Sequence, residues 1–598
     1  MTDPAGYGQR TTPYFYTPAP APPPPSFSTT TRLLCSAAYL DHGFARTVID
    51  EVVENEQRAV APSADFDLEP VVRHSYRARK MLFVRDLVLT GLLLAGLILV
   101  PFVTLAWILT AAGILAMRRN ATLGSGAAAG LRSTALFVTA LIVLCCLGAF
   151  TPLLLLPGGS DTSSASDPFG GPYGGDTGGL GSSLEEAALQ TAFSATALVF
   201  LLVMLPVALA AGTLVTSAVH RISAFRAMLS SFGAAVPGTA PPLPNDRIAR
   251  RMAWVRAAQY GNVTVHARNP LLGAGNPVSG ASWTMALTLR PDPNATHGGS
   301  RPPTDVHTLV DPQEIHLRLR ERVLALADPA LPEHQRVPGV RIADHVVADG
   351  ERRDGDPLLD REHRPHAVAA PEAITAIIRH PQGGLRYYQR FVVGVDGKQV
   401  MADDGSLVLP AQSQEIAISA FVHVAVEGGR LYAEFIGMLL PPVREEFHVA
   451  DRLRPTAAPG FGAALLTAVK SWPDTVKAPL RVARSLWQMA TLQSRMNRAR
   501  TDSRENLIND YGARISVREL ASEELPRKFL QALDAEKYLQ LVEKAVSEAL
   551  LDYLDERQID TSEYRRRMAF IQNNNTTISD STFVNSAVAV GANASASK

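Results

Sequence analysis

The sequence predicts a membrane-embedded α-helical region, a cytoplasmic α+β domain with a mainly antiparallel sheet, and a C-terminal helical region. Three observations predict this fold class. Three apolar stretches exceed the ~18 residues that suggest a spanning helix, clusters of arginine flank them, and alternating strand patterns followed by helical patterns come after the last one. With 598 residues, the chain is long enough for several domains.

Composition excludes several classes of protein. The chain has 57 Lys+Arg and 57 Asp+Glu, so its formal net charge is zero, which argues against a generally basic nucleic-acid binder. A hydrophobic fraction of 46% is that of a folded protein and not of a wholly disordered one. Three cysteines cannot build a disulfide framework, and we expect Cys35 to be a buried thiol on a helix. We expect no nucleic-acid partner.

Residues 1–30 are polar and proline-rich, and a run of this kind favours polyproline II and cannot bury a core. We therefore expect a disordered tail that contains no secretory signal. Residues 31–80 are expected to form a juxtamembrane helical region, with Asp41 as an N-cap and a second helix starting after Asp67. The first of these helices should bury Phe44, Val48 and Val52 and expose Glu51, Glu54 and Glu56.

The membrane region is expected to cover residues 81–220. Its first apolar stretch, 81–117, would make a helix of ~54 Å, which is too long for a hydrocarbon core of ~30 Å. Pro101 lies near its centre, and proline breaks helices. We predict two helices forming a hairpin around Pro101, the alternative being a re-entrant hairpin that does not reach the far face. Further spans are expected at 134–157 and 189–219.

Basic residues indicate the orientation, because cytoplasmic flanks are enriched in Lys and Arg. The predicted membrane-interface residues around the first stretch are Arg77, Arg79, Lys80, Arg118 and Arg119. The loop 158–188 contains no Lys or Arg and is expected to be external. These patterns predict four membrane segments with both termini in the cytoplasm. The arginine-rich composition is typical of a high-GC bacterial genome, so we expect the bacterial plasma membrane.

Ionisable residues are almost absent from the four predicted segments, apart from Arg85 and Asp86 at the first boundary. Proton relays and ion-coupled sites usually need charged groups inside the membrane. The pattern therefore argues against a coupled transporter.

After a linker at 221–244, residues 245–453 show the pattern of an α+β domain. Strands are expected at 262–266 and 282–289, and a helix at 314–327. Alternation along 416–426 and 431–435, joined by Gly428-Gly429, is typical of a hairpin. Asp396-Gly397 suggests a second hairpin between 387–395 and 398–401. The charged stretch 349–366 is expected to be a loop.

Residues 454–570 are expected to be helical. Lys477, Arg481, Arg484 and Trp487 lie in a basic amphipathic segment, which is either an interfacial membrane anchor or an ordinary surface helix. Asp534 is expected to cap a helix whose buried face is Val542, Ala545, Val546, Ala549, Leu550, Tyr553 and Leu554. Residues 571–598 form a low-complexity tail that is either disordered or a short β-solenoid.

Few residues in the sequence form a pattern typical of a catalytic or ligand-binding site. A tight group of possible metal ligands contains Asp360, Glu362, His363 and His366, but Arg361 and Arg364 alternate with them and no zinc-ligand spacing is present. Gly273-Ala-Gly275 lacks a third glycine and a following helix, so we expect a turn. We assign no metal, no cofactor and no catalytic residue.

Several short segments resemble a family of uncharacterised multi-pass integral membrane proteins of actinobacteria. The segments are Ala37-Ala-Tyr-Leu-Asp41, Ala59-Val-Ala-Pro-Ser63, Gly261-Asn-Val, Leu272-Gly-Ala-Gly275, Leu440-Pro-Pro442, Tyr511-Gly-Ala-Arg514, Ser516-Val-Arg-Glu519 and Asn573-Asn574. The resemblance implies a membrane protein without an established activity. The C-terminal tail also resembles short glycine- and serine-rich endings of some bacterial signalling and defence proteins.

Three functions remain open from the sequence. The first is a membrane-anchored scaffold or signalling protein that acts through the lipid bilayer and protein partners or as a homo-oligomer. The second is a membrane-associated enzyme with its site in 245–453, and the third, disfavoured by the uncharged spans, is a pore or transporter.

Overall fold

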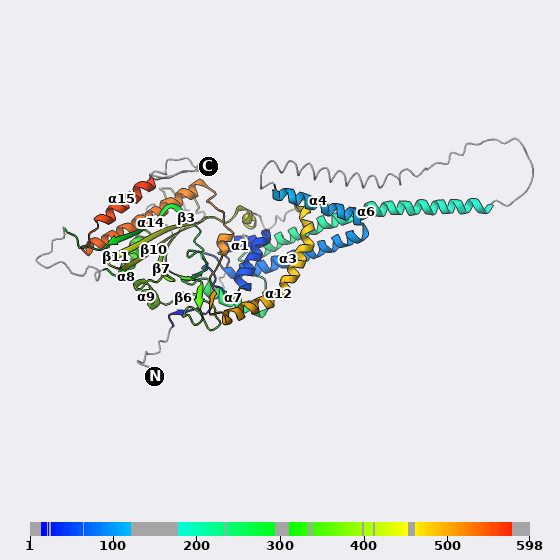
Figure 1. The fold of residues 1–598 in the computed structure, drawn as a ribbon. Helices are drawn as coiled ribbons and strands as arrows, with labels where there is room; N and C mark the ends of the chain where they lie inside the picture. The colour runs from blue at the N-terminus through cyan, green and yellow to red at the C-terminus, as the bar shows by residue number, and fades with distance from the viewer. Residues whose placement is uncertain are drawn as a thin grey trace, which may run out of the picture. The chain divides into compact units, whose positions relative to one another are not determined.

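The computed structural model describes residues 13–120, 178–293, 310–452 and 461–576, with short gaps at 21, 23–25, 64, 234–235, 333–335, 338, 397–399, 403 and 411–412. The chain divides into two compact units (Figure 1). Unit 1 is drawn from residues 1–78, 228–453 and 492–598, and unit 2 from residues 79–227 and 454–491.

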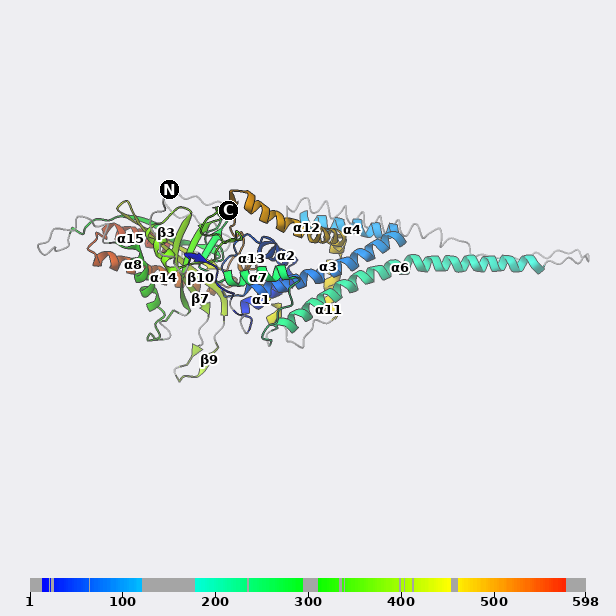
Figure 2. The ribbon, with the colours of Figure 1, turned by 90° about the horizontal axis from the view of Figure 1, so that it is seen from below.

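Unit 1 contains a six-stranded sheet in the order β2-β4-β7-β10-β11-β3, of which β3, β7 and β10 are labelled in Figure 2. Neighbouring strands are antiparallel except for β2 and β4, which are parallel. The strands are β2 (Val263–His266), β3 (Asn276–Thr288), β4 (Val340–Asp349), β7 (Leu385–Asp396), β10 (Ser413–Glu427) and β11 (Arg430–Leu440). The predicted α+β architecture is confirmed for this unit, with a mixed sheet in which antiparallel pairs dominate.

The clearest predicted hairpin is confirmed. Strands β10 and β11 pair up to Glu427 and Arg430, and the connecting Gly428 and Gly429 have φ of 56° and 72°. Two left-handed residues give the tight turn that matches strand twist.

The second predicted hairpin, around Asp396-Gly397, is wrong. Strand β7 pairs with β4 and β10, whereas β8 (Val400–Met401) pairs with β9 (Leu407–Leu409). The apolar β7 has a sheet neighbour on each edge, so no edge is left for the short β8.

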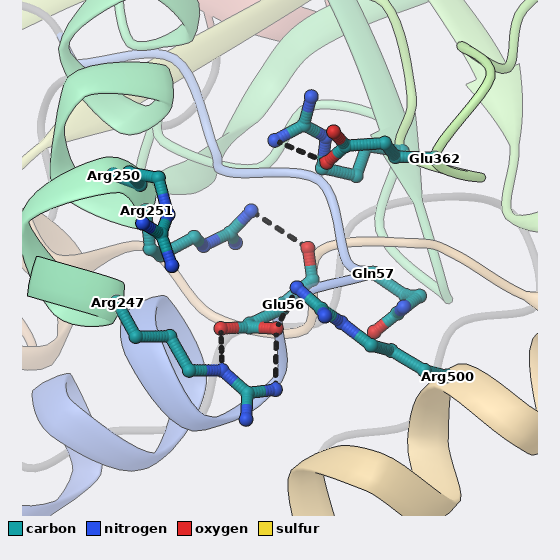
Figure 3. A pocket seen from close by; sticks show the side chains of 8 residues that line it. Glu56, Gln57, Arg247, Arg250, Arg251, Glu362 and Arg500 are labelled. Carbon is teal, nitrogen blue, oxygen red and sulfur yellow. Dashed lines mark hydrogen bonds and ion pairs between the residues drawn. The ribbon is translucent and has the colours of Figure 1, made fainter.

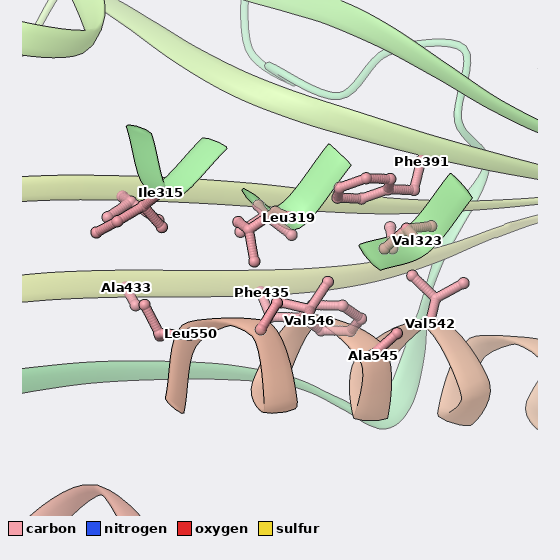
Figure 4. Packing of buried hydrophobic residues seen from close by; sticks show 14 of the residues in the cluster. Ile315, Leu319, Val323, Phe391, Ala433, Phe435, Val542, Ala545, Val546 and Leu550 are labelled. Carbon is pink, nitrogen blue, oxygen red and sulfur yellow. The ribbon is translucent and has the colours of Figure 1, made fainter. Parts of the chain in front are cut away.

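Three helices cover one face of the sheet: α8 (Pro312–Ala325), α9 (Pro371–Arg379) and α14 (Phe529–Glu556). The strands turn alternate residues toward this face, so that Val422 of β10 lies opposite Phe435 of β11. The residues labelled in Figure 4 are Ile315, Leu319, Val323, Phe391, Ala433, Phe435, Val542, Ala545, Val546 and Leu550. Full burial of each large apolar side chain contributes roughly 1.5–3 kcal/mol, which fixes the sheet and its helices as one body.

The predicted apolar face of α14 is buried in this core, but its predicted N-cap is wrong. The helix begins at Phe529, and the backbone N–H of Lys528 donates to Oε1 of Gln531 at 3.1 Å. Asp534 instead lies within the helix and pairs with Lys537. The buried face contains Val542, Ala545, Val546, Ala549, Leu550, Tyr553 and Leu554.

The opposite face of the sheet is covered by the segment after β2, which contains the Gly273-Ala-Gly275 turn. A second buried cluster here contains Leu271, Ala274, Val347, Tyr388, Phe421 and Met438. Gly273 and Gly275 have φ of 95° and 89°, which favours glycine. The predicted turn is therefore confirmed.

Helices that lie wholly in unit 1 before the sheet include α1 (Thr29–Leu40), α2 (His42–Ile49), the short π-helix η1 (Asp50–Glu54) and α7 (Asp246–Ala258). Asp41 caps α2, since its Oδ1 accepts from the N–H groups of Gly43 and Phe44. Cys35 on α1 has no exposed surface. The cap, the buried thiol and the start of the next helix at Leu68, after Asp67, are confirmed.

The remaining elements of unit 1 are short, apart from the last helix. They are β1 (Phe15–Tyr16), β5 (Glu351–Arg353), β6 (Val368–Ala369), η3 (Glu445–His448), α10 (Val449–Arg452), β12 (Ile508–Asp510), α13 (Val517–Leu520) and α15 (Ser562–Thr576).

Two of these strands and the end of α15 lie where the sequence predicts no regular structure. Strand β1 pairs with β6, although it lies in the proline-rich region 1–30. Strand β5 pairs with β12, although it lies in the charged stretch 349–366. Helix α15 extends to Thr576, so the expected tail begins as helix. The proposed β-solenoid in the tail 571–598 is not tested, because residues 577–598 lie outside the described residues.

Unit 2 is helical. Helices α3 (Leu68–Leu99), α6 (Gly178–Phe232) and α12 (Ala478–Glu505) each contribute part of their length to it, together with α4 (Pro101–Asn120), α11 (Phe461–Ser471) and η4 (Trp472–Lys477). Pro473 lies in η4 and Pro479 in the first turn of α12, so the prolines mark the break between α11 and α12.

The predicted break around Pro101 is confirmed as a helix boundary. Helix α3 ends at Leu99 and α4 begins at Pro101, because proline is tolerated in a first turn but not inside a helix. Figures 1 and 2 show that α4 runs back from the end of α3. A Cβ on Gly96 would lie 2.7 Å from Oγ1 of Thr104, so glycine permits the two helices to approach closely.

Among the described residues, two helical segments are long and apolar enough to cross a membrane, Leu68–Leu99 and Met204–Phe232, and a shorter apolar segment is Pro101–Met117. The predicted span at 134–157 lies outside the described residues. Helix α6 begins at Gly178 and continues to Phe232, so part of the predicted external loop 158–188 and part of the predicted linker 221–244 are helical.

Candidate functional site

A cavity of about 360 Å³ in unit 1 is lined mainly by arginine (Figure 3). We call it the arginine cavity, and its lining residues are Glu56, Gln57, Arg247, Arg250, Arg251, Glu362, Arg364 and Arg500. Five arginines against two glutamates give the lining a net charge of +3. Small-molecule sites have volumes of ~300–1,000 Å³, so this cavity is large enough for a small anionic molecule.

Helix α7 supplies three of the arginines. Asn245 caps the helix, since its Oδ1 accepts from the backbone N–H of Ile248 at 2.9 Å. Arg247, Arg250 and Arg251 then follow at spacings of three and four residues, which places them on one side of the helix. One capped helix therefore directs three guanidinium groups to one wall.

Glu56 binds two arginines at the opposite wall. Arg247 donates Nε to Oε1 and Nη2 to Oε2, both at 2.9 Å, and Arg500 of α12 lies 2.9 Å from Oε2. Burial raises the pKa of Glu56, but the hydrogen bond and charge of Arg247 and the charge of Arg500 outweigh it and lower that pKa below its usual value. Glu56 is therefore ionised at neutral pH.

The prediction that Glu54 and Glu56 are exposed is wrong. They are 8% and 6% exposed, and Arg495 of α12 pairs with Glu54 at 2.9 Å. Arginines far away in sequence cover these carboxylates, which a helical pattern in 41–56 cannot reveal. Val52 and the rest of the predicted apolar face are buried as expected.

Arg251 has a structural role in the wall. It is 3% exposed and donates to the backbone carbonyls of Val52, Glu56 and Arg58 at 2.8–3.0 Å. Its guanidinium lies 4.3 Å from the Trp254 ring centroid. Burial lowers the pKa of Arg251 to about 9, so it remains charged at neutral pH. It ties the chain after η1 to α7 and adds a fixed positive charge.

Of the predicted group of possible metal ligands, only Glu362 lines the cavity, together with the neighbouring Arg364. Arg364 pairs with Asp360 at 2.9 Å and with Glu362 at 3.2 Å, while His363 lies 3.8 Å from Asp354. Among the residues that the structure describes, no group of three or more His, Cys, Asp or Glu side chains could hold a metal ion. The carboxylates here bind an arginine instead.

Arg250 differs from the other four arginines. It is exposed at the cavity, and within the described ranges it has no ion pair or side-chain hydrogen bond. Because its donors are not used by a carboxylate, Arg250 is the lining arginine best placed to meet a ligand. Both lining glutamates are ion-paired, so the cavity offers positive charge and donors, an arrangement suited to binding an anion.

The predicted membrane-interface residues belong to α3, α4, η4 and α12. In unit 1, Arg77 donates to Oγ of Ser231 at 3.3 Å; in unit 2, Lys80 is exposed and Lys477 pairs with Asp474 at 3.0 Å. Arg484 is exposed and Trp487 is 71% exposed. Arg79 lies on α3 and Arg118 and Arg119 lie at the end of α4.

Arg481 has a partner that the sequence does not indicate. It lies 2.6 Å from Asp86 of α3 within unit 2. The two ionisable residues predicted at the first membrane boundary, Arg85 and Asp86, also pair with each other at 2.8 Å. Asp86 therefore has two arginine partners.

Several motifs quoted for the family resemblance meet at Glu519. Its Oε1 accepts from the backbone N–H groups of Gly273 and Gly275, both at 2.8 Å. The neighbouring Arg518 donates to the carbonyl of Pro441 at 2.9 Å, and Ser516 caps α13. These segments therefore form a structural junction between α13 and the sheet.

A family model of the AbeC-like domain matches residues 282–585, just over half of the 598-residue chain. The match runs from β3 to beyond α15 and includes Glu362, Arg364 and Arg500 of the arginine cavity. No curated protein and no solved structure matches the chain. On the strength of the match over residues 282–585, the chain belongs to the AbeC-like domain family.

Proposed function

We propose that the protein is a multi-pass membrane protein of the bacterial plasma membrane and that unit 1 is a scaffold or signalling module at its cytoplasmic face. In this proposal α3, α4 and α6 supply three of four membrane segments, the fourth being 134–157, and both termini are cytoplasmic. Unit 1 would act through protein partners or self-association.

The exposed apolar surface of the long helices supports this proposal. Within each of these helices lies an apolar segment of 18 residues. Only 17% of the segment in Leu68–Leu99 and 11% of the segment in Met204–Phe232 are buried. Ile98 and Phe102, at the turn between α3 and α4, are 79% and 85% exposed. The core helix of a water-soluble protein buries such residues, and large exposed apolar patches are sites of contact with a membrane or protein. A lipid environment accounts for this surface.

Polar groups in unit 2 fit the same proposal. Thr90, Thr104 and Thr216 donate their hydroxyl hydrogens to backbone carbonyls four residues earlier, at 2.6–3.1 Å. Such bonds give the hydroxyl groups hydrogen-bond partners, which lipid tails cannot provide. Trp487 and Leu480 are each 71% exposed on one side of α12, and aromatic residues are enriched at membrane interfaces.

The arginine cavity favours a binding role over acid–base catalysis. A general base needs an available carboxylate or imidazole, whereas Glu56 and Glu362 are both held by arginine. No histidine occurs among the lining residues that the structure describes. We therefore place the scaffold or signalling function ahead of the enzyme.

Fractionation and cysteine labelling test the proposal. After expression in bacteria, the protein should remain in the carbonate-washed membrane fraction. In a variant without its native cysteines, a membrane-impermeant maleimide should label Asp167→Cys in intact cells and Leu407→Cys only after permeabilisation. Recovery in the soluble fraction would reject membrane anchoring, and labelling of Leu407→Cys in intact cells would reject the orientation.

Labelling of Phe102→Cys separates the two forms of the α3–α4 hairpin. A hairpin that crosses fully should be labelled from outside, whereas a re-entrant hairpin should not. Affinity purification from detergent extracts tests the scaffold role, and recovery of neither a partner nor a second copy of the chain would count against it.

A further inference from the structure

We propose that the arginine cavity binds a phosphate-bearing ligand. Arg250 contacts the ligand first, and Arg247 and Arg500 then release Glu56 and bind the ligand instead. This inference concerns unit 1 alone and does not depend on membrane anchoring.

The charge of the lining favours a group with more than one negative charge. The cavity carries a net charge of +3, and a single carboxylate would leave most of it uncompensated. A phosphate monoester carries about −1.5 to −2 at neutral pH, and a diphosphate carries more. Multiply charged phosphate therefore matches this lining better than a carboxylate does.

The donors also match phosphate in geometry. Guanidinium groups bind phosphate oxygens through two parallel hydrogen bonds. Arg250 lines the cavity beside α7 (Figure 3), and within the described part of the chain no carboxylate pairs with it. Arg251 keeps its donors on backbone carbonyls, so it contributes charge and a rigid wall.

The carboxylate of Glu56 already binds the arginines as a phosphate group would. It holds Arg247 in a bidentate pair and also binds Arg500, which is the arrangement that two arginines make with a phosphate. The side chains of Arg247 and Arg500 are 18% and 50% exposed, so both can reach solvent or a ligand. An incoming phosphate would compete with Glu56 for these two guanidinium groups.

The cavity volume sets the size of the ligand. About 360 Å³ exceeds the space that one inorganic anion needs, since sites of ~300 Å³ or more hold small organic molecules. A phosphorylated small molecule or a phospholipid headgroup therefore fits the site better than an inorganic ion.

Calorimetric titration with inorganic pyrophosphate tests the site. The full-length protein in detergent micelles should bind the probe saturably, and Arg250→Gln should weaken binding by about ten-fold, as expected from losing one charge-assisted interaction. Arg430→Gln, an exposed arginine at the end of the β10–β11 hairpin, is the matched control and should bind as the wild type does. Thermal unfolding should be the same in both variants.

Two results would overturn the proposal: no saturation up to about 10 mM pyrophosphate, which is the range of the weakest specific sites, or equal affinities of Arg250→Gln and the wild type. A second variant tests the exchange step. Glu56→Gln removes the competing charge and should tighten binding by about three-fold or more, whereas weaker binding in a folded Glu56→Gln protein would reject the exchange.

Adding phosphatidic acid, a lipid whose headgroup is a phosphate monoester, to the micelles distinguishes the two sources of phosphate. Competition with pyrophosphate that disappears in Arg250→Gln supports a lipid headgroup as the ligand. Unchanged pyrophosphate binding supports a soluble phosphorylated molecule. Competition that is the same in Arg250→Gln and the wild type would contradict binding of lipid at this site.

Discussion

Arg481 of α12 donates Nε to Oδ2 of Asp86 at 2.6 Å and Nη2 to Oδ1 at 3.0 Å, joining residues 395 positions apart in the sequence. Asp86 is 2% exposed, and Arg85 donates to the same carboxylate at 2.8 Å. A buried carboxylate is costly unless it is paired. The pair therefore explains how α3 tolerates an acidic residue beside its apolar stretch.

Replacing Arg481 by Gln should destabilise unit 2. The variant leaves Asp86 buried with Arg85 as its remaining arginine partner, and breaking a buried pair from one side costs roughly 3–5 kcal/mol. Thermal unfolding in detergent micelles measures the loss. Arg484→Gln, an exposed arginine one turn further along α12, should unfold at the wild-type temperature. An equally stable Arg481→Gln protein would show that the pair contributes little.

Replacing Gly275 by Ala should disrupt the junction at Glu519. An added Cβ would lie 2.1 Å from the carbonyl oxygen of Leu439, and the residue has a φ of 89°. The unfavourable backbone conformation and the steric clash together should lower the free energy of unfolding by about 3 kcal/mol or more. Gly405→Ala is the matched control, because its φ is 79° but nothing lies within 4 Å of the added Cβ.

Gly405→Ala should therefore lose only the conformational part, about 1–2 kcal/mol. Urea unfolding followed by circular dichroism compares the two variants. If both lose the same stability, the close approach of the β11 backbone to Gly275 is not the cause.

Buried histidines should make unit 1 less stable in mild acid. Burial lowers the pKa of His316 and His345 to about 3 and that of His423 to about 4. These residues protonate near 6.5 in the unfolded chain, so the unfolded state binds more protons below that pH. Stability should be complete above pH 6.5 and fall as the pH drops toward 4, by up to about 1.4 kcal/mol per pH unit for each histidine.

Urea unfolding at pH 7, 6 and 5 measures this slope. His345→Gln removes one of the three groups and should make the slope shallower, while His380→Gln changes an exposed side chain and should leave it as in the wild type. A His345→Gln protein with the wild-type slope would mean that His345 does not titrate on unfolding.

The sequence correctly predicted elements whose structure depends on residues close to one another in the chain. Gly428-Gly429 specifies a tight turn wherever two strands flank it, the apolar spacing along α14 specifies a helix face, and Pro101 ends a helix. The error at Asp534 has the same origin. An aspartate can cap a helix or lie on its surface, and Gln531 supplied the cap contact to Lys528 three residues earlier.

The arginine cavity could not be predicted in the same way, because its parts come from distant segments. Glu56 meets Arg247, 191 residues away, and Arg500 in the C-terminal part of the chain. The three arginines of α7 indicate one basic helix side, but their pattern does not reveal which carboxylates face them. Likewise, the sheet pairing of β7 depended on β4 and β10 and not on the nearby Asp396-Gly397.

Trp487 should lie at the lipid interface if α12 is a membrane anchor and not an ordinary surface helix. Its side chain is 71% exposed, and Leu480, seven residues earlier, is equally exposed. Residues seven apart lie on one side of a helix, and an indole beside an aliphatic chain is typical of the interface. In nanodiscs with brominated lipid, Trp487→Phe should therefore remove part of the tryptophan quenching that the wild type shows.

The matched control is Trp254→Phe, since Trp254 is 8% exposed in unit 1 and stacks with Arg251. Bromine quenches an indole only at short range, so removing Trp254 should leave the quenched signal unchanged. If Trp487→Phe is quenched as strongly as the wild type, Trp487 does not contact lipid. In that case its exposed side of α12 must be covered by water or by another protein.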